Sequence, residues 1–324
     1  MNSKELIVLE LLNKDSHVSQ RKLAFEASIS IGTVNAILKY LDKNNYIEVS
    51  LQKRKNEYRL TDKGLAELEA YIQATKLKKI VVSPNVSKCV TQAVVLSAGQ
   101  RKDFDVPVGF LKINGQCLLD RQVELLKKYG IEKIIVIAGY KVELYQSLQQ
   151  DISIVYNENY QSTGTMVSLA LAQKEITDDF LLIEGDLYFE EKAIVELLEY
   201  KNHSCMLLSD RSYSGDETLV EIRNNFVYKM GKDITQFNQI HGEMTGMCKL
   251  SFDIYQKMLQ EFVDNQNAYV NYEYILMDVA GSYSIGYVKL DNLYWSEIDN
   301  TTQYEQTKKI ANRLCLEEKY GQRV

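Results

Sequence analysis

A buried strand that opens at once into a small, basic loop is the feature that most constrains this chain. The stretch Ala93–Asp120 has the sequence AVVLSAGQRKDFDVPVGFLKINGQCLLD. The apolar residues 93–96 predict the strand, and the small residues 97–99 let backbone N–H groups approach a ligand closely. Arg101 and Lys102 then add positive charge. The stretch therefore predicts a site for the phosphates of a nucleotide.

Apolar runs alternate with amphipathic segments after this loop. The expected strands are residues 93–96, 134–137, 152–156, 180–183 and 206–209, and the expected helices are residues 118–129, 142–149, 165–173 and 190–200. Apolar strands separated by helices predict a mostly parallel sheet covered on both faces. A more β-rich segment follows, with strands expected at 219–223, 226–230, 245–250, 284–290 and 294–299. Ligands of such sheets bind at the carboxyl ends of the strands.

Carboxylates occur at two further strand ends. Glu184 and Asp186 flank a glycine directly after the strand FLLI, and Glu297 and Asp299 end the segment YWSEID. Alternation in an extended segment puts Glu297 and Asp299 on the same side. Carboxylates that converge beside a phosphate-binding loop suit a hard divalent cation. We therefore expect Mg²⁺, shared with a nucleotide, at these strand ends.

The first 75 residues predict a separate module. The segments 3–12, 19–25 and 30–41 each begin at a serine and carry apolar residues at helical spacing, with Ile31 expected on the buried face of the third. Two β-rich pieces joined by the turn QKRKN follow, and then a helix that begins TDKGLAEL. This order of elements resembles the winged helix-turn-helix domains of bacterial regulators.

The resemblance implies a specific mode of DNA binding, in which the third helix enters the major groove and the wing contacts phosphate. It assigns base contacts to Thr33, Asn35 and Lys39, and phosphate contacts to Lys53, Arg54 and Lys55. Residues 1–80 hold 14 Lys and Arg against 10 Asp and Glu, a balance of +4, whereas the rest of the chain carries −10. Because +4 is modest for a DNA-binding domain, docking or dimerisation stays open as its role.

The composition places the two domains and limits the protein class. We expect a winged helix-turn-helix domain at 1–75, a polar linker at 76–90 that contains KLKK, and a catalytic domain at 91–324. The scattered cysteines form no CxxC pair, which argues against zinc and disulfides. No apolar run is long enough to cross a membrane and no secretory signal is evident, so a cytoplasmic protein with no membrane partner is expected.

Five motifs between residues 92 and 310 resemble the nucleotidyltransferases related to nucleoside-diphosphate-sugar pyrophosphorylases. The motifs are LSAGQRKDFDVPVGFLKING, LLDRQVELLKKYGIEKIIVIAGYK, YNENYQSTGTMVSLALA, LLIEGDLYFEEKAI and YWSEIDN. They are most similar to the branch that contains choline-phosphate and 2-aminoethylphosphonate cytidylyltransferases. The resemblance implies an α/β fold, a Rossmann-like (GT-A-like) mixed sheet with helices on both faces.

The same resemblance implies roles for individual residues. Cytosine and ribose would be held by Leu96, Ser97, Ala98 and Gly99, completed by Thr163, Gly164 and Ser168. Arg101 and Lys102 would bind the triphosphate, and Asp186, Glu297 and Asp299 would bind Mg²⁺. Many relatives have a lysine beside the proline of the loop, whereas valines flank Pro107 here, so Lys102, Lys112 or Lys141 would have to supply that charge.

The acceptor is expected to be a small phosphate or phosphonate that carries an amine. Its pocket residues are expected among tyrosines, the tryptophan and acidic residues, with the first choices being Tyr160, Tyr213, Glu273, Tyr294 and Trp295. A cage of rings would favour phosphocholine, because a cation is attracted to ring faces. One ring with a carboxylate would favour 2-aminoethylphosphonate, because a carboxylate accepts hydrogen bonds from a primary amine.

The sequence thus predicts a CTP-dependent cytidylyltransferase of cell-surface polymer decoration that releases pyrophosphate. One alternative is a transcriptional regulator whose catalytically weakened domain senses CTP or a metabolite. The missing loop lysine supports this alternative. A sugar-phosphate nucleotidyltransferase is a third hypothesis. Whether the chain binds DNA, and whether it forms a homodimer, stays open.

Overall fold

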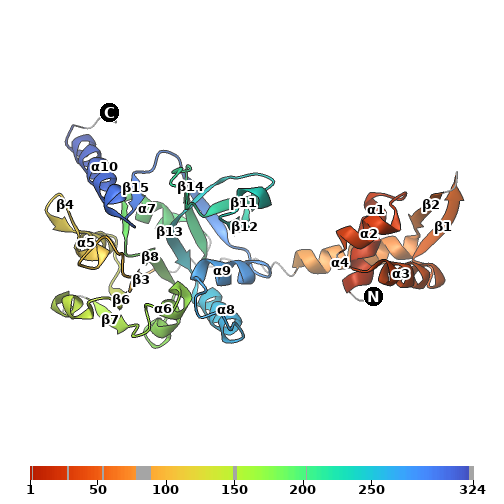
Figure 1. The fold of residues 1–324 in the computed structure, drawn as a ribbon, viewed down its shortest axis with the longest axis horizontal. Helices are drawn as coiled ribbons and strands as arrows, with labels where there is room; N and C mark the ends of the chain where they lie inside the picture. Colours follow the sequence, from red (N-terminus) through yellow and green to blue (C-terminus); the bar gives the residue numbers. More distant parts are fainter. Residues whose placement is uncertain are drawn as a thin grey trace. The chain divides into compact units, whose positions relative to one another are not determined.

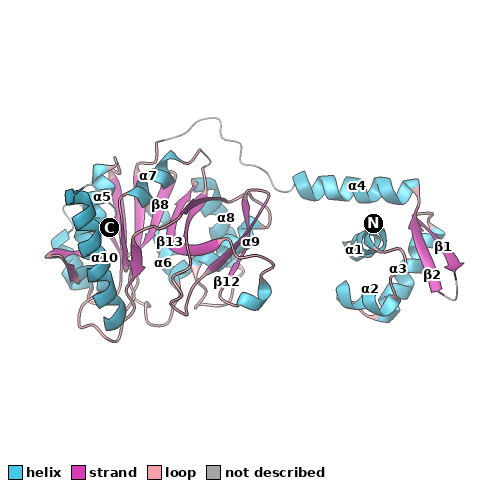
Figure 2. Ribbon diagram, turned by 90° about the horizontal axis from the view of Figure 1, so that it is seen from above, coloured by secondary structure: helices cyan, strands magenta, loops and turns pink. Residues whose placement is uncertain are grey.

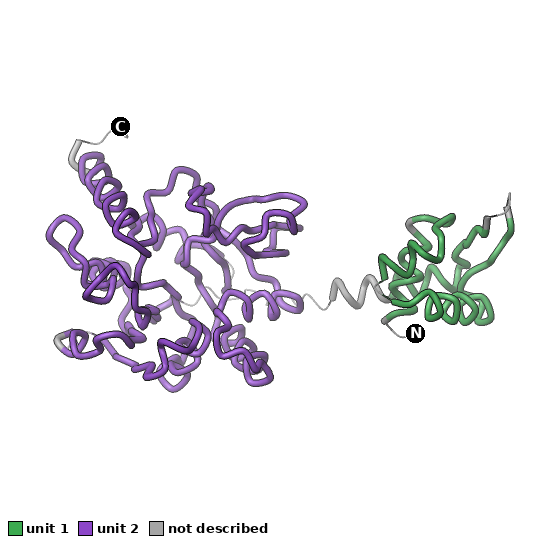
Figure 3. Tube along the Cα trace, viewed as in Figure 1, with its two compact units in different colours: residues 1–79 green, residues 80–324 purple. Residues whose placement is uncertain are grey.

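The computed structural model describes residues 1, 3–27, 29–52, 55–77, 89–148, 152–201 and 203–320. The chain divides into two compact units, Met1–Lys79 and Ile80–Val324, each with its own hydrophobic core (Figure 3). Most of the expected linker at 76–90 lies outside the described residues, and the helix before it continues to Leu77.

The first unit consists of four helices and a two-stranded wing (Figure 1). Its elements are α1 (Ser3–Lys14), α2 (Gln20–Glu26), α3 (Ile31–Lys43), β1 (Ile47–Gln52), β2 (Lys55–Leu60) and α4 (Asp62–Leu77). Ser19 and Ser30 cap α2 and α3, because their side chains accept hydrogen bonds from Lys22 N and Thr33 N. The expected burial of Ile31 is wrong: this residue begins α3, ahead of the buried face that starts at Val34, and is 45% exposed.

The second unit is built on a nine-stranded mixed sheet in the order β12-β11-β13-β8-β3-β6-β7, with β10 paired to β13 and β14 paired to β10. The strands are β3 (Gln92–Ser97), β6 (Lys133–Ala138), β7 (Ser153–Tyr156), β8 (Phe180–Glu184), β10 (Cys205–Ser209), β11 (Leu219–Arg223), β12 (Phe226–Gly231), β13 (Gly242–Leu250) and β14 (Gly286–Leu290). The long strand β13 pairs antiparallel with β8, β10 and β11. The mixed sheet that the family resemblance implied is therefore confirmed, and the mostly parallel sheet is not.

Helices cover both faces of this sheet (Figure 2). The helices are α5 (Leu118–Lys128), α6 (Thr165–Leu171), α7 (Lys192–Glu199), α8 (Phe252–Val263), α9 (Tyr272–Ala280) and α10 (Thr301–Tyr320). The apolar residues of α6, α8 and α9 pack in one core, and those of α5 and α7 pack in the other. Along β3 the side chains alternate, so that Val94 belongs to the first core and Val95 to the second.

Shorter elements connect the strands and helices of the second unit. They are the 3-10 segments Val108–Phe110, Val142–Leu148, Ala172–Lys174 and Ile234–Gln236 and the strands β4 (Lys112–Ile113), β5 (Gln116–Cys117), β9 (Leu187–Phe189) and β15 (Trp295–Glu297). The helix expected at 142–149 is thus a 3-10 segment. Antiparallel pairing of β9 with β15 brings the segment after Asp186 beside the segment before Asp299. Within the described ranges, no helix is both long and apolar enough to span a membrane.

Candidate active site

The turn after β8 places Asp186 at the edge of the sheet. Gly185 N donates to Leu96 O over 2.8 Å, which ties this turn to the end of β3. A Cβ on Gly185 would lie 2.7 Å from the Cβ of Ser97, so only glycine allows this approach. The buried side chain of Gln122 on α5 donates to Glu184 O and Leu187 O, at 3.2 and 2.8 Å. The turn that carries Asp186 is therefore held by β3 and by α5.

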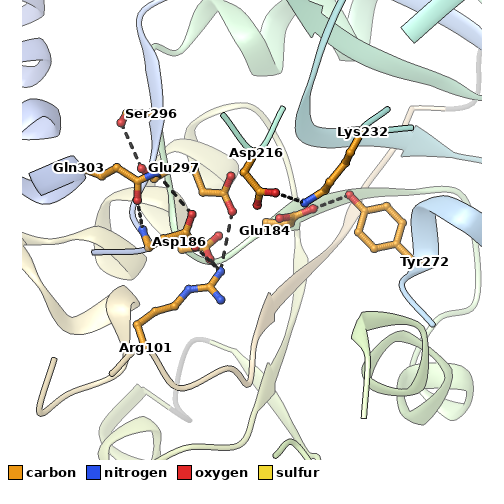
Figure 4. Close-up of polar contacts among 10 residues, drawn as sticks. Arg101, Glu184, Asp186, Asp216, Lys232, Tyr272, Ser296, Glu297 and Gln303 are labelled. Carbon is orange, nitrogen blue, oxygen red and sulfur yellow. Dashed lines mark hydrogen bonds and ion pairs between the residues drawn. The ribbon is translucent and has the colours of Figure 1, made fainter. Parts of the chain in front are cut away.

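The second pair of carboxylates reaches the same place in a different way from that expected. Glu297 ends β15, whereas Asp299 lies beyond this strand, so strand alternation does not relate the two side chains. Ile298 N donates to Asp186 O over 3.1 Å and attaches this segment to the turn after β8. Both carboxylates then face one cation, Arg101, from the loop after β3 (Figure 4).

Arg101 bridges three carboxylates from two segments of the chain. Its Nη2 atom lies 2.8 Å from Asp186 Oδ2, 2.7 Å from Asp299 Oδ1 and 3.8 Å from Glu297 Oε1. Burial lowers the pKa of Arg101, but the attraction of these three carboxylates outweighs it and the pKa is raised. The guanidinium therefore stays charged and neutralises part of an acidic site.

Too many acids meet here for one arginine to neutralise. Burial, followed by repulsion from neighbouring carboxylates, raises the pKa of Glu184 to about 8 and that of Glu297 to about 9. Burial also raises the pKa of Asp186, against the attraction of Arg101. Such a site gains stability when further positive charge arrives.

The carboxylates fit a divalent cation. One oxygen each of Glu184, Asp186 and Glu297 can be chosen so that all lie within 4.8 Å of one another. Asp186 Oδ1 is buried and has no hydrogen-bond partner, which is the state expected of an oxygen that awaits a metal. Three carboxylate oxygens form a donor set that suits Mg²⁺. Glu184 was not among the expected ligands, and Asp299 joins the group through Arg101.

A cavity beside these carboxylates is lined by all seven residues expected to hold the nucleotide. These residues are Leu96, Ser97, Ala98, Gly99, Thr163, Gly164 and Ser168. Gly164 leaves no room for a side chain, because a Cβ there would lie 2.3 Å from Val270 O. Tyr160, expected in the acceptor pocket, also lines this cavity. We refer to it as the nucleotide cavity.

Two buried polar residues that sequence reasoning missed support the nucleotide cavity. The Asn157 side chain donates to Ser168 Oγ and Thr163 Oγ1, at 3.0 and 3.1 Å. Tyr145 lies under the loop after β3, where its hydroxyl donates to Ser97 O over 2.8 Å. Burial raises the pKa of Tyr145 to about 12, so it stays a neutral donor. Asn157 lies within the motif YNENYQSTGTMVSLALA, which was the available signal, whereas Tyr145 lies outside all five motifs and gave none.

A second cavity, of about 280 Å³, adjoins the first and shares Arg101, Thr165 and Glu184 with it. Its charged lining residues are Arg101, Glu184, Asp216, Lys232, Glu243, Glu273, Glu297 and Asp299. No aromatic ring occurs among the described residues that line it. We refer to it as the acidic cavity.

The acids of this cavity are held by neighbouring polar groups. Tyr272 donates its hydroxyl hydrogen to Glu184 Oε1 over 2.8 Å, and Lys232 pairs with Asp216 at 2.7 Å (Figure 4). Burial raises the pKa of Glu273. The acidic cavity therefore offers several fixed carboxylates beside the end of the nucleotide cavity.

The remaining expected residues lie elsewhere. Neither cavity is lined by Lys102, Lys112 or Lys141, and Lys141 donates to Asp105 O. Tyr213 and Trp295 line a neighbouring, larger pocket, while the Tyr294 hydroxyl donates to Glu317 Oε1 over 2.7 Å. Of the five expected acceptor residues, only Glu273 lines the acidic cavity.

The residues expected to contact DNA lie in the first unit. Asn35 and Lys39 are exposed on α3, and Thr33 is half-buried. Lys53 and Arg54 lie outside the described residues, and Lys55 begins β2.

Gly246 shapes the acidic cavity from β13. Its φ is +76°, beside an irregularity in the pairing of β13 with β10, and a Cβ there would lie 3.0 Å from Glu184 Cδ. We expect Gly246→Ala to lower the free energy of unfolding by about 2 kcal/mol, from backbone strain and this contact together. Gly130→Ala is the matched control, because Gly130 has φ +83° and open space around its Cβ position. In urea unfolding, an equal loss in both variants would contradict the contact with Glu184.

Residues 93–222 match the family model of the MobA-like NTP transferase domain, and residues 1–48 match that of the winged helix-turn-helix DNA-binding domain. The second unit carries a nucleotidyltransferase domain. The first unit carries a winged helix-turn-helix domain. The fold of the nucleotidyltransferase domain is similar to that of the inositol-1-phosphate CTP transferase from T. maritima, with a TM-score of 0.60, 20% identity and coverage of 69% of this chain and 96% of that one.

Two curated relatives share parts of this nucleotidyltransferase domain. The bifunctional sugar-1-phosphate nucleotidylyltransferase/acetyltransferase of Sulfurisphaera tokodaii is 27% identical over 258 residues, which is 70% of this chain and 62% of that protein. The choline-phosphate cytidylyltransferase of Streptococcus pneumoniae is 29% identical over 104 residues, which is 30% of this chain and 45% of that protein. The chain thus spans less than two thirds of the length of either relative.

Proposed function

We propose that the second unit transfers CMP from CTP to a small phosphate or phosphonate that carries a primary amine, and that pyrophosphate is released. The observation that carries the proposal is the junction of three parts at Arg101: the nucleotide cavity, the carboxylate group and the acidic cavity. Nucleotide and acceptor would then meet beside Asp186. The similarity to cytidylyltransferases supports CTP as the nucleotide.

The reaction needs little acid or base catalysis. An acceptor oxygen that is already anionic attacks the α-phosphorus of CTP in line, and the bond to the oxygen that bridges to the β-phosphorus breaks with its electrons leaving on pyrophosphate. The chief obstacle is repulsion between two anions, which positive charge must neutralise. A bound Mg²⁺ would be held by Glu184, Asp186 and Glu297 and would supply charge neutralisation. Arg101 provides a second positive charge at the same point.

The lining of the acidic cavity supports a primary amine. A quaternary ammonium has no N–H groups and is commonly recognised by aromatic faces, which are absent from the described lining of this cavity. A primary ammonium donates three hydrogen bonds, and the carboxylates there can accept them. We therefore favour an aminoethyl phosphonate or phosphate over phosphocholine, with Glu273 as an anchor for the ammonium group.

The test is a pyrophosphate-release assay of the full chain with Mg²⁺. CTP, UTP, ATP and GTP are each combined with 2-aminoethylphosphonate, phosphoethanolamine, phosphocholine and hexose 1-phosphates. We expect release with CTP and an aminoethyl acceptor. Release only with a sugar phosphate, or no release with any pair, would reject the proposal.

For the first unit we propose DNA binding, supported by its family match and by the exposed side chains of Asn35 and Lys39 on α3. Lys39→Ala is expected to lower the affinity for DNA by roughly tenfold, since one charge and one contact are lost. The measurement is a gel shift with the DNA upstream of the operon that encodes this chain. Lys4→Ala, an exposed lysine on α1, is the control. Equal affinity of both variants would argue for docking or dimerisation instead. A CTP-dependent shift without pyrophosphate release would favour the sensor hypothesis.

A further inference from the structure

Arg101 holds the position at which a cation interacts best with the active-site acids. A single nitrogen, Nη2, is within 4 Å of Asp186, which follows β8, and of Glu297 and Asp299, which lie together at the end of β15 and just after it. Two of these residues, Asp186 and Glu297, are also members of the group that fits a divalent cation. The arginine therefore acts as the counter-ion of the residues that could hold the metal.

A guanidinium and a divalent cation cannot both hold these oxygens at little cost. Like charges a few ångströms apart repel by several kcal/mol at the effective dielectric of a protein site. Asp186 Oδ1, which has no hydrogen-bond partner, belongs to the same carboxylate whose Oδ2 lies 2.8 Å from Arg101, so a metal on Oδ1 would place two cations on one carboxylate. Metal binding therefore either requires Arg101 to move or is weakened by its positive charge.

The nucleotide cavity offers Arg101 an alternative position. Arg101 lines the nucleotide cavity in addition to the acidic cavity, so its side chain borders the space where the phosphates of a nucleotide would lie. Phosphate oxygens accept charge-assisted hydrogen bonds from arginine at least as well as carboxylates do. The phosphates of a bound nucleotide can thus replace the carboxylates as partners of the guanidinium, which leaves the carboxylates available to the metal.

We propose that Arg101 closes the metal site in the absence of nucleotide and transfers to the nucleotide phosphates on binding, so that the divalent cation binds tightly only together with the nucleotide. This inference rests on the proposed function of the site but not on the identity of the acceptor. Arg101 would pair first with the carboxylates and then with the nucleotide phosphates. This one side chain would therefore make tight metal binding depend on the nucleotide.

The test measures metal affinity instead of turnover. Mn²⁺ is titrated into the full chain without nucleotide, and the free ion is followed by its electron paramagnetic resonance signal. Arg101→Met is expected to bind Mn²⁺ at least tenfold more tightly than the unaltered protein, since the competing cation is gone. When a non-cleavable CTP analogue with a methylene bridge between the α- and β-phosphorus is added, the affinity of the unaltered protein should rise more than that of Arg101→Met.

Two variants control for charge and folding. Lys232→Met removes a cation that lines the same acidic cavity but pairs with Asp216, so it should change Mn²⁺ affinity less than threefold. Arg101→Lys keeps a positive charge and should restore most of the weak binding. Equal or weaker Mn²⁺ binding by Arg101→Met, or the same gain in Lys232→Met, would overturn the proposal. Because no acceptor is present, a failure of the proposed acceptor would appear only in the pyrophosphate assay.

Discussion

Asp186→Asn is expected to lower the turnover number of pyrophosphate release by about 10³-fold, because a metal ligand worth several kcal/mol to the transition state is lost. Asp186 lies at the centre of the site. Its Oδ2 pairs with Arg101, whereas its Oδ1 has no hydrogen-bond partner. Its backbone oxygen accepts a hydrogen bond from Ile298 N, in the segment of Glu297 and Asp299. Steady-state kinetics at saturating CTP and Mg²⁺ measures this effect.

The control for this variant is Asp210→Asn. Asp210 also follows a strand of the same sheet, but its carboxylate pairs with Lys289 at 3.3 Å and accepts from Asn292 N. It lines neither the nucleotide cavity nor the acidic cavity. Turnover should stay within about twofold in Asp210→Asn. Retention of normal Mg²⁺-dependent activity by Asp186→Asn would remove the basis of the site assignment.

Glu273→Gln is expected to raise the KM for an aminoethyl acceptor by about 10- to 100-fold, while the KM for CTP changes little. The substitution keeps the shape of the side chain and removes its charge, and a hydrogen bond to a charged group contributes about 1.5–3 kcal/mol. Glu273 lies in the lining of the acidic cavity, beside Asn271 and Thr165, and does not line the nucleotide cavity. Initial-rate kinetics with each substrate varied in turn measures both constants.

A pair of acceptors provides the control for Glu273. Ethylphosphonate lacks the amine of 2-aminoethylphosphonate but keeps the attacking group. If Glu273 binds the ammonium, the variant loses efficiency with 2-aminoethylphosphonate only. A similar loss with both acceptors would show that Glu273 acts on the fold of the cavity, and Glu261→Gln, at an exposed position of α8, should leave both acceptors unaffected.

Local patterns predicted most of the elements of the second unit. The strand expected at 219–223 is observed as Leu219–Arg223, and the helix expected at 118–129 is observed as Leu118–Lys128. These elements follow from apolar runs and helical spacing, which are properties of neighbouring residues. Seven residues at helical spacing do not distinguish an α-helix from a 3-10 segment, which explains the difference at Val142–Leu148.

Long-range pairing was beyond the reach of the sequence. All nine residues of β13 are buried, and a strand buried on both faces has the same apolar pattern whether its neighbours run parallel or antiparallel. The placement of β13 between β8 and β10 could therefore not be inferred. The same holds for Tyr272, whose hydroxyl meets Glu184 across 88 positions of the chain.

The expected site residues also differ in whether a local pattern fixed their position. Those at strand ends, such as Ser97 and Asp186, lie where the pattern placed them, because strand ends of one sheet share an edge. The tyrosines were expected from their chemistry alone, without a position in the sheet. Tyr160 and Tyr213 accordingly line other cavities, and the acidic cavity has carboxylates where rings had been considered.

The two cavities are formed mainly by different stretches of the chain. The nucleotide cavity is lined by residues 96–186, within the family match at 93–222, whereas most residues of the acidic cavity come from 216–299. If the two cavities bind acceptor and nucleotide as proposed, a lineage could exchange its acceptor by altering the later stretch while it inherits the earlier one intact. Chimeras that swap residues 210–290 between relatives would carry over acceptor choice and leave nucleotide choice with the recipient.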